Sequence, residues 1–236
     1  MKVALMFKAF WKLSVYNMKI VFGGKFVWFC LVALLLFLVL MFQTAWEGIV
    51  PNESIIYSQL FFPAILLVFY PSVFGIQNDA DNKILEILFG IPNYMYKVWL
   101  MRLLLIYIEV FFILVFYSYL AKYLLYPVYP FEMAYQVMYP ALFMGTLAFL
   151  FSTLTRNGNA TAILVIVLGI VIWMLGGIMF SNHWAFIQLN PYDIPNNIHP
   201  VIWEATIFKN RLFLGIGSVV WMMLGLLNLQ KREKFI

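Results

Sequence analysis

Six apolar stretches, each about twenty residues long, constrain this chain more than any other feature of its sequence. They occupy residues 26–42, 55–76, 99–121, 134–154, 160–180 and 212–229. An α-helix needs about 20 apolar residues to cross the roughly 30 Å hydrocarbon core of a bilayer. Because lipid offers the backbone no hydrogen-bond partners, such segments cross as helices. The sequence therefore predicts an all-α integral membrane fold, with six transmembrane helices in a single transmembrane domain over residues 1–236.

The composition favours a membrane protein over a soluble one. Hydrophobic residues make up 65% of the 236 residues and charged residues 11%, with a mean hydropathy of +0.93. A soluble domain averages about 25% charged residues. The net charge of +5 does not indicate nucleic-acid binding, because the basic residues follow the predicted topology. The single cysteine, Cys30, excludes an intrachain disulfide.

The basic residues predict the orientation in the membrane, because they accumulate in loops on the cytoplasmic side. With the N-terminus inside, twelve basic residues lie on the inner side: Lys2, Lys8, Lys12, Lys19, Lys25, Lys83, Lys97, Arg102, Arg156, Lys231, Arg232 and Lys234. Only three lie on the outer side: Lys122, Lys209 and Arg211. Both termini are therefore predicted to be cytoplasmic.

Two segments outside the apolar stretches have amphipathic character. Residues 1–24 mix lysines with Phe, Trp and Leu, a pattern typical of a helix that lies in the membrane interface. Residues 181–211 form the longest outer connection and are too apolar for a simple solvated loop. We expect short re-entrant helices there, one of them running from Pro200 to about Phe208, that lie in or dip back into the outer leaflet.

The polar interval over residues 77–102 predicts a further helix on the cytoplasmic side. Asp79 or Asp81 can cap its start, because their side-chain oxygens accept hydrogen bonds from free backbone N–H groups. Gly90 and Pro92 end it, which places the helix over residues 79–91. One broad face is apolar and consists of Ile84, Leu85, Ile87, Leu88 and Phe89. From periodicity alone, the membrane surface and a soluble partner cover that face equally well.

One ionisable residue, Glu109, lies within a predicted span. An acidic side chain at the centre of a bilayer costs about 2.5 kcal/mol or more, so we expect it to face the interior of the bundle. Gln59 and Gln136 are its candidate partners. A substrate or proton path and a hydrogen-bonded packing role both remain open for Glu109.

The sequence contains no motif that indicates catalysis or metal binding. Gly23-Gly24-Lys25 lacks the rest of a phosphate-binding loop. His183 and His199 stand sixteen residues apart, without cysteines or clustered carboxylates nearby. We therefore predict no catalytic residue, no metal site and no cofactor held by this chain.

A short cytoplasmic pattern resembles a signature of the ABC type 2 permeases, the membrane subunits of ABC exporters. The run from Ile84 to Leu88 is followed by Gly90-Ile91-Pro92 and later by Arg102. In that family a Glu lies six residues before a Pro, and a basic residue opens the third span about ten residues after it. Glu86, Pro92 and Arg102 match those positions. Asn93, Tyr94 and Met95 differ from the Ser or Thr and Arg that usually follow the proline.

The likeness extends to the architecture of the whole chain. The family has an amphipathic helix before the first span, short helices before the sixth and a basic tail. Residues 1–24, 181–211 and 231–234 match these features. Asn190-Pro191-Tyr192 also resembles a recurrent turn of the last outer loop.

The resemblance implies a transport subunit that relies on a partner for energy. A separate ABC ATPase subunit would bind ATP and Mg²⁺ and hold the helix over residues 81–89 in a cleft. Two permeases, either two copies of this chain or this chain and a related one, would form an exporter with two ATPases in the plasma membrane, which in bacteria is the inner membrane. The residues implied in coupling are Asp81, Ile84, Leu85, Glu86, Leu88, Phe89, Pro92 and Arg102.

Two other classes of function remain as alternatives. A secondary transporter or channel would mark its path with intramembrane charge, often within internal repeats. This chain has one such charge, Glu109, and no visible repeat. A non-transporting membrane scaffold or immunity protein would need no ATPase, so co-purification with an ATPase subunit separates these possibilities.

Overall fold

The computed structural model describes residues 26–81, 95–175 and 183–229. In these ranges the chain forms α2 (Phe26–Trp46), α3 (Glu53–Asp81), the short π-helix η1 (Met95–Leu100), α5 (Met101–Leu124), α6 (Pro130–Thr155), α7 (Gly158–Leu175) and α8 (Pro200–Leu229). No strand occurs among the described residues. The predicted interfacial helix at residues 1–24, the basic tail and residues 82–91 of the predicted cytoplasmic helix lie outside the described residues.

Five of these helical segments are long and apolar enough to cross a membrane: α2, α3, α6, α8 and the helix over Val98–Leu124. Each contains one of the predicted apolar stretches. α7 is shorter, and the end of the stretch predicted at residues 160–180 lies outside the described residues. The chain is therefore a multi-pass membrane protein that is helical in the described parts of its long apolar segments.

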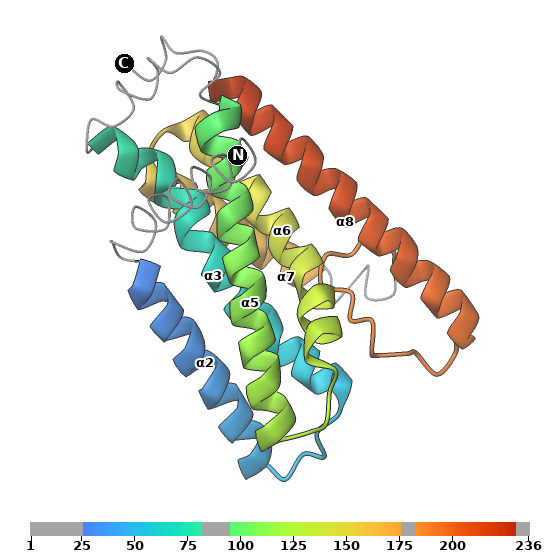
Figure 1. The fold of residues 1–236 in the computed structure, drawn as a ribbon. Coiled ribbons are helices and arrows are strands. Elements are labelled where there is room, and N and C mark those ends of the chain that lie inside the picture. Colours follow the sequence, from blue (N-terminus) through green and yellow to red (C-terminus); the bar gives the residue numbers. More distant parts are fainter. Residues whose placement is uncertain (1–25, 82–94, 176–182, 230–236) are drawn as a thin grey trace, which may run out of the picture.

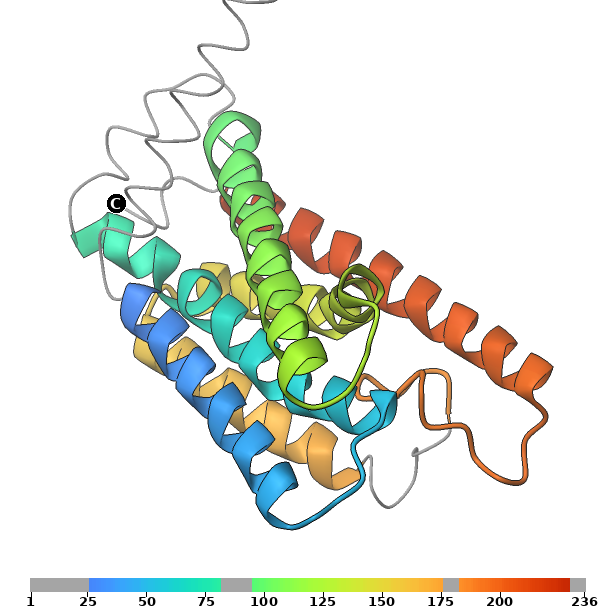
Figure 2. The same ribbon diagram turned by 60° about the horizontal axis from the view of Figure 1, so that its bottom comes forward.

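Successive helices run in alternating directions through one bundle (Figure 1). α6 lies at its centre and packs against α3, α5, α7 and α8, whereas α2 packs mainly against α3. Figure 2 shows α2 and α8 at the periphery, with the start of α8 inclined away from the other helices. We name the end at which α3 finishes and α5 begins the Asp79 end. The opposite end, with the loops at 47–52, 125–129 and 183–199, is the Arg211 end.

The surface around the circumference of the helix bundle is apolar, as expected of a surface in contact with lipid. On α5 the exposed side chains recur every three or four residues, at Leu104, Ile108, Phe112, Phe116 and Tyr119. This spacing places them on one face of the helix. The opposite face packs into the core through residues such as Val110 and Leu114, both fully buried.

Glycines allow α8 to approach α6 closely. A Cβ atom added to Gly217 would lie 2.5 Å from the ring of Phe143, and one added to Gly225 would lie 2.7 Å from the ring of Phe149. Small residues at such contacts let transmembrane helices pack against each other at short range. Two phenylalanine rings of α6 thus fill the space that the two glycines leave on α8.

The turn between α6 and α7 is as short as the sequence predicts. Arg156 adopts the left-handed conformation, with φ of 57°, and ends α6. Oδ1 of Asn157 then accepts hydrogen bonds from the backbone N–H of Asn159 (2.9 Å) and of Ala160 (3.2 Å). The Gly158 N–H donates to Oε1 of Gln77 at 2.5 Å, which ties the start of α7 to α3.

The prediction of separate short helices before the last span is wrong for the described residues. Residues 183–199 form turns rather than a helix, because Asn190-Pro191 and Pro195 interrupt the backbone hydrogen bonding of a helix. The helix that begins at Pro200 does not end near Phe208 but continues to Leu229. Asn210 and Arg211, which lie just before the predicted last span, are buried and hydrogen-bonded within the bundle.

Of the two residues predicted to cap the cytoplasmic helix, Asp79 or Asp81, Asp79 does not do so. α3 continues through Asp81, so Asp79 lies in the last turn of α3 rather than at the start of the next helix. Asp79 is buried, and its carboxylate pairs with Arg102 rather than with the backbone N–H groups that a cap would bind.

Candidate functional site

A buried ion pair between α3 and α5 lies at the Asp79 end of the bundle. Nη1 of Arg102, in the first turn of α5, lies 2.6 Å from Oδ2 of Asp79, in the last turn of α3. The guanidinium carbon of Arg102 lies 4.9 Å from the centre of the Trp99 ring. This pair joins the two helices on either side of residues 82–94, although those residues themselves lie outside the described part of the chain.

The structure places only two of the predicted coupling residues. Arg102 is buried in the ion pair, and Asp81 is the exposed last residue of α3. The others lie outside the described residues: Ile84, Leu85, Glu86, Leu88, Phe89 and Pro92. Sequence reasoning identified Arg102 but missed Asp79 as its partner. The sequence did contain a signal, because Asp79 lies just after one apolar stretch and the oppositely charged Arg102 lies near the start of the next.

The three intramembrane polar residues do not form one cluster through hydrogen bonds. Nε2 of Gln59 donates to the Thr44 hydroxyl and to the Leu40 carbonyl oxygen on α2. Gln136 accepts a hydrogen bond from Arg211. Glu109 is half-buried, and its Oε1 has no hydrogen-bond partner among the described residues. The predicted partnership of Glu109 with Gln59 and Gln136 is therefore wrong, because both amides bind groups on other helices.

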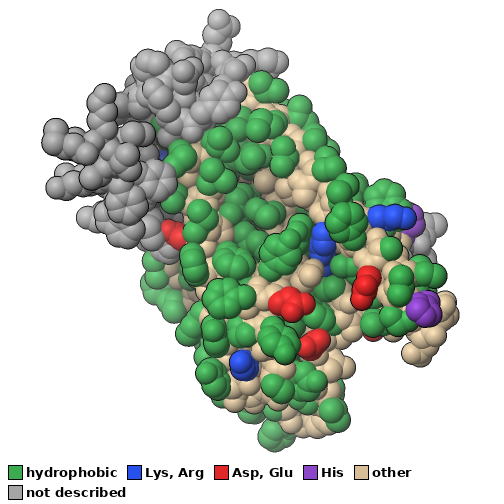
Figure 3. Space-filling model, turned by 45° about the vertical axis from the view of Figure 1, so that its right-hand side comes forward, with side chains coloured by type: hydrophobic (Ala, Val, Ile, Leu, Met, Phe, Trp, Pro, Cys, Tyr) green, Lys and Arg blue, Asp and Glu red, His purple; other side chains and the backbone are tan. Residues whose placement is uncertain are grey.

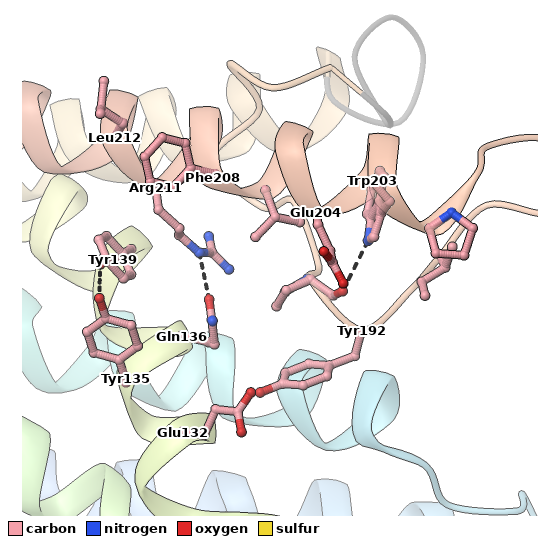
Figure 4. A pocket seen from close by; sticks show the side chains of 14 residues that line it. Glu132, Tyr135, Gln136, Tyr139, Tyr192, Trp203, Glu204, Phe208, Arg211 and Leu212 are labelled. Carbon is pink, nitrogen blue, oxygen red and sulfur yellow. Dashed lines mark hydrogen bonds between the residues drawn. The ribbon is translucent and has the colours of Figure 1, made fainter.

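A cavity of about 610 Å³ opens at the Arg211 end, between α6, α8 and the loop at 183–199 (Figure 4). The first turns of α6 line it at a spacing of three or four residues, with Glu132, Tyr135, Gln136 and Tyr139. The first three turns of α8 line it with Trp203, Glu204, Ile207, Phe208, Arg211 and Leu212. Figure 3 shows Lys or Arg and Asp or Glu side chains near each other on this side of the molecule, among hydrophobic ones.

Arg211 is the most buried charged residue of this cavity, with 7% of its surface exposed. Its Nε donates to Oε1 of Gln136 and its Nη1 to Oδ1 of Asn210, both at 2.8 Å. Nη2 lies 3.4 Å from the hydroxyl oxygen of Tyr57. The guanidinium carbon is 5.4 Å from the centre of the Tyr139 ring. Neutral oxygens and aromatic rings, rather than a carboxylate, surround this cation.

Hydrogen bonds fix the loop at 183–199 against the bundle. The side-chain amide of Asn190 donates to the Ser54 carbonyl oxygen at 2.9 Å, and its Oδ1 accepts from the Tyr192 N–H at 3.0 Å. Nε1 of Trp203 donates to the Pro191 carbonyl oxygen at 3.1 Å. The amide of Asn210 donates to two carbonyl oxygens of the same loop, each at 2.8 Å. The wall that the loop contributes to the cavity is therefore held in place.

Acidic and phenolic groups surround the rest of the cavity. Figure 4 shows the carboxylates of Glu132 and Glu204 and the ring of Tyr192 around the space that the Arg211 guanidinium faces. Burial raises the pKa of the Tyr192 hydroxyl, and the nearby carboxylates of Glu132 and Glu53 raise it further. Tyr192 therefore keeps its proton at neutral pH and can donate a hydrogen bond.

The groups that line this cavity can bind a ligand that has both charged and apolar parts. It combines a buried cation, two carboxylates, hydroxyl donors and aromatic rings around a space large enough for a small ligand or headgroup. Among the described residues there is no cluster of His, Cys, Asp and Glu that could hold a metal ion. Gln136 was singled out from the sequence, but Arg211 was counted only as an outer basic residue. Its burial follows from the length of α8, which the sequence pattern did not indicate.

Comparison with protein-family models, with characterised proteins and with solved structures gives no match for this chain.

Proposed function

We propose that this chain is the membrane permease subunit of an ATP-driven exporter, similar to the ABC type 2 permeases. The chain itself hydrolyses no ATP. A separate ATPase subunit with bound ATP and Mg²⁺ contacts the segment at residues 81–89, and a second permease copy completes the transport path. In this arrangement the Asp79 end faces the cytoplasm and the Arg211 end faces outward from the plasma membrane.

The observation that carries the proposal is the buried pair of Asp79 and Arg102. It joins α3 to α5 at the two borders of the segment that the ATPase would contact. Leaving one member of a buried ion pair without its partner typically costs about 3–5 kcal/mol, so Asp79 and Arg102 are expected to stay paired when α3 and α5 move. A force on residues 82–94 would then move α3 and α5 as a unit.

Packed aromatic rings extend this connection across the bundle. The ring of Trp99 lies beside Arg102 and has its centre 6.2 Å from that of Phe149 in α6. Phe149 in turn fills the space beside Gly225 of α8. Interiors packed in this way switch between discrete arrangements rather than deforming gradually. A movement at the Asp79 end therefore has a route through α5 and α6 to α8, which lines the cavity at the other end.

Neutral variants of the ion pair test this coupling. We expect Asp79→Asn and Arg102→Gln each to lower ATP hydrolysis coupled to transport at least about tenfold in reconstituted membranes, a loss of roughly 1.4 kcal/mol of coupling. The ATPase subunit should still co-purify, because its contacts lie in the segment and not in the pair. Thermal unfolding of each purified variant shows whether the protein is folded.

The controls remove the same charges at exposed positions of the Arg211 end. Asp193→Asn matches Asp79→Asn, and Lys122→Gln matches Arg102→Gln. Both controls should leave coupled hydrolysis unchanged. If the folded Asp79→Asn and Arg102→Gln proteins retain the wild-type rate of coupled ATP hydrolysis, the ion pair does not transmit movement from the ATPase to the helices.

One observation favours a secondary transporter as the second candidate. The half-buried carboxyl of Glu109, with Oε1 shielded and unbonded among the described residues, is the kind of group that marks an ion path in a membrane protein. The two functions differ in their need for a partner. A secondary transporter moves its substrate in proteoliposomes that contain this chain alone, whereas the exporter requires the ATPase subunit and ATP.

A further inference from the structure

The Arg211 guanidinium is a buried cation that lacks an anionic partner. It has five N–H donors, and the bonds to Gln136, Asn210 and Tyr57 use three of them, which leaves two. Arg211 forms no ion pair with any described residue. A buried charge is costly unless it is paired, and the cavity gives an incoming anion direct access to this one (Figure 4).

An anion alone does not match the rest of the cavity, because two carboxylates line the same space. Glu132 enters from α6 and Glu204 from α8, and neither pairs with a basic residue in the described part of the chain. The rings of Tyr139, Tyr192 and Trp203 also face the cavity. Carboxylates and aromatic faces together attract an ammonium group. The lining thus complements a ligand that carries both signs of charge.

The level of the cavity along the helices indicates an amphiphilic ligand. No charged residue follows Glu132 in α6 or Arg211 in α8, so both lie at the border of an uncharged segment long enough to span hydrocarbon. At the mouth of the cavity the side chains of Phe208 and Leu212 are 68% and 51% exposed. Apolar chains of a ligand can lie on these two residues while its polar group enters the cavity.

We propose that the Arg211 cavity binds the headgroup of a zwitterionic, phospholipid-like amphiphile. Its phosphate accepts hydrogen bonds from Arg211, its ammonium group lies between Glu132 and Glu204, and its chains lie along Phe208 and Leu212. The cavity volume of about 610 Å³ accommodates a headgroup of this size. This inference does not depend on the exporter proposal, since it requires neither an ATPase nor transport.

Equilibrium binding to the delipidated, full-length chain in detergent tests the proposal. The probes are dihexanoyl phosphatidylethanolamine, which is zwitterionic, and dihexanoyl phosphatidylglycerol, which carries the phosphate without an ammonium group. We expect the zwitterionic lipid to bind at least about tenfold more tightly, the difference expected for one charge-assisted contact. Equal affinity for the two lipids in the wild-type chain would overturn the proposal.

Variants of Glu132 and Glu204 test whether these carboxylates bind the ammonium group. Glu132 and Glu204 are both exposed, so Glu132→Gln with Glu204→Gln should fold normally. This double variant should lose the preference for the zwitterionic lipid and bind phosphatidylglycerol as well as the wild type or better. The control, Glu47→Gln with Asp193→Asn, removes two exposed acids at the same end that do not line the cavity and should retain the preference. If the Glu132 and Glu204 double variant still prefers the zwitterionic lipid, these carboxylates do not bind the ammonium group.

Two further measurements complete the test. Arg211→Gln should weaken the binding of both lipids about equally, because both present a phosphate. Free glycerophosphoethanolamine, which has the headgroup without chains, should bind much more weakly than the lipid. Equal affinity for this soluble headgroup would contradict the amphiphilic part of the proposal and indicate a soluble zwitterion.

Discussion

Two buried arginines are stabilised by different chemistry at the two ends of this protein. Arg102 is paired with Asp79 at 2.6 Å, so its charge is balanced within the chain. Arg211 is surrounded by amide and hydroxyl oxygens and aromatic rings, which solvate the cation without neutralising it. The first arrangement fixes two helices together. The second leaves a charge that a ligand can still neutralise.

The packing of α8 against the Phe143 ring of α6 depends on the absence of a side chain at Gly217. A methyl group there would lie 2.5 Å from the buried ring of Phe143, so the ring or the helix would have to move. Overpacking of this kind costs about 1–3 kcal/mol. We expect Gly217→Ala to lower the free energy of unfolding by that amount, measured by denaturant titration in detergent micelles.

Gly215, on the same helix, provides the matched control. A Cβ atom there meets no atom within 4 Å, so Gly215→Ala should be neutral or slightly stabilising. Equal effects of the two substitutions would mean that α8 does not pack on α6 in the way described.

At the scale of the elements, the existence of the helices followed from the sequence, whereas their ends did not. Apolar runs of about twenty residues located every long helix, because the length needed to cross a bilayer leaves little freedom. Polar residues misled the assignment of the ends. Asp79 lies within α3, beyond the predicted stretch, where it pairs with Arg102. Asn210 and Arg211 lie within α8, where they bind the loop and Gln136.

The same reason explains which parts of the cavity could be predicted. Gln136 stood out as a polar residue in an apolar stretch, but its partner lies 75 residues away on another helix. Local periodicity carries no information on which helices become neighbours in the bundle. Only the packing of α8 against α6 brings Arg211 to Gln136 and forms the cavity between the two helices.

The alternation of helices makes a prediction about topology. We expect cysteines at Asn159 and at Asn197, in a Cys30→Ala background, to be labelled by membrane-impermeant reagents from opposite sides. Both positions are exposed, and the side chain of Asn159, unlike that of Asn157, makes no contact that caps α7. Asn197 should be labelled from outside the cell. Labelling of both cysteines from the same side would contradict the alternation.

At the scale of the molecule, α6 connects the two charged regions. Phe149 of α6 packs against Trp99 at the Asp79 end, and Gln136 of α6 binds Arg211 at the other end. Because α6 also packs closely against four other helices, a movement of α6 at one end must also move its neighbours. This arrangement fits a protein in which events on one side of the membrane change a binding cavity on the other side.

Association with an ATPase subunit tests the exporter proposal most directly. The tagged chain is purified from its native membranes, and a co-purifying ATPase is detected by photolabelling with azido-ATP. We expect the wild-type chain to retain the subunit. Leu88→Ala with Phe89→Ala should reduce its recovery at least about tenfold, because truncation of an apolar anchor costs roughly 1–2 kcal/mol or more. Glu86→Ala should show a milder loss.

The control for this measurement is Tyr123→Ala with Leu124→Ala, which truncates an exposed aromatic and leucine pair at the Arg211 end. It should retain the ATPase as the wild type does. If the protein is an exporter subunit, recovery of the ATP-binding subunit falls strongly in the Leu88 and Phe89 double variant, falls mildly in Glu86→Ala and is unchanged in the control. Equal recovery in both double variants, or no ATP-binding subunit with the wild-type chain, would contradict the exporter proposal.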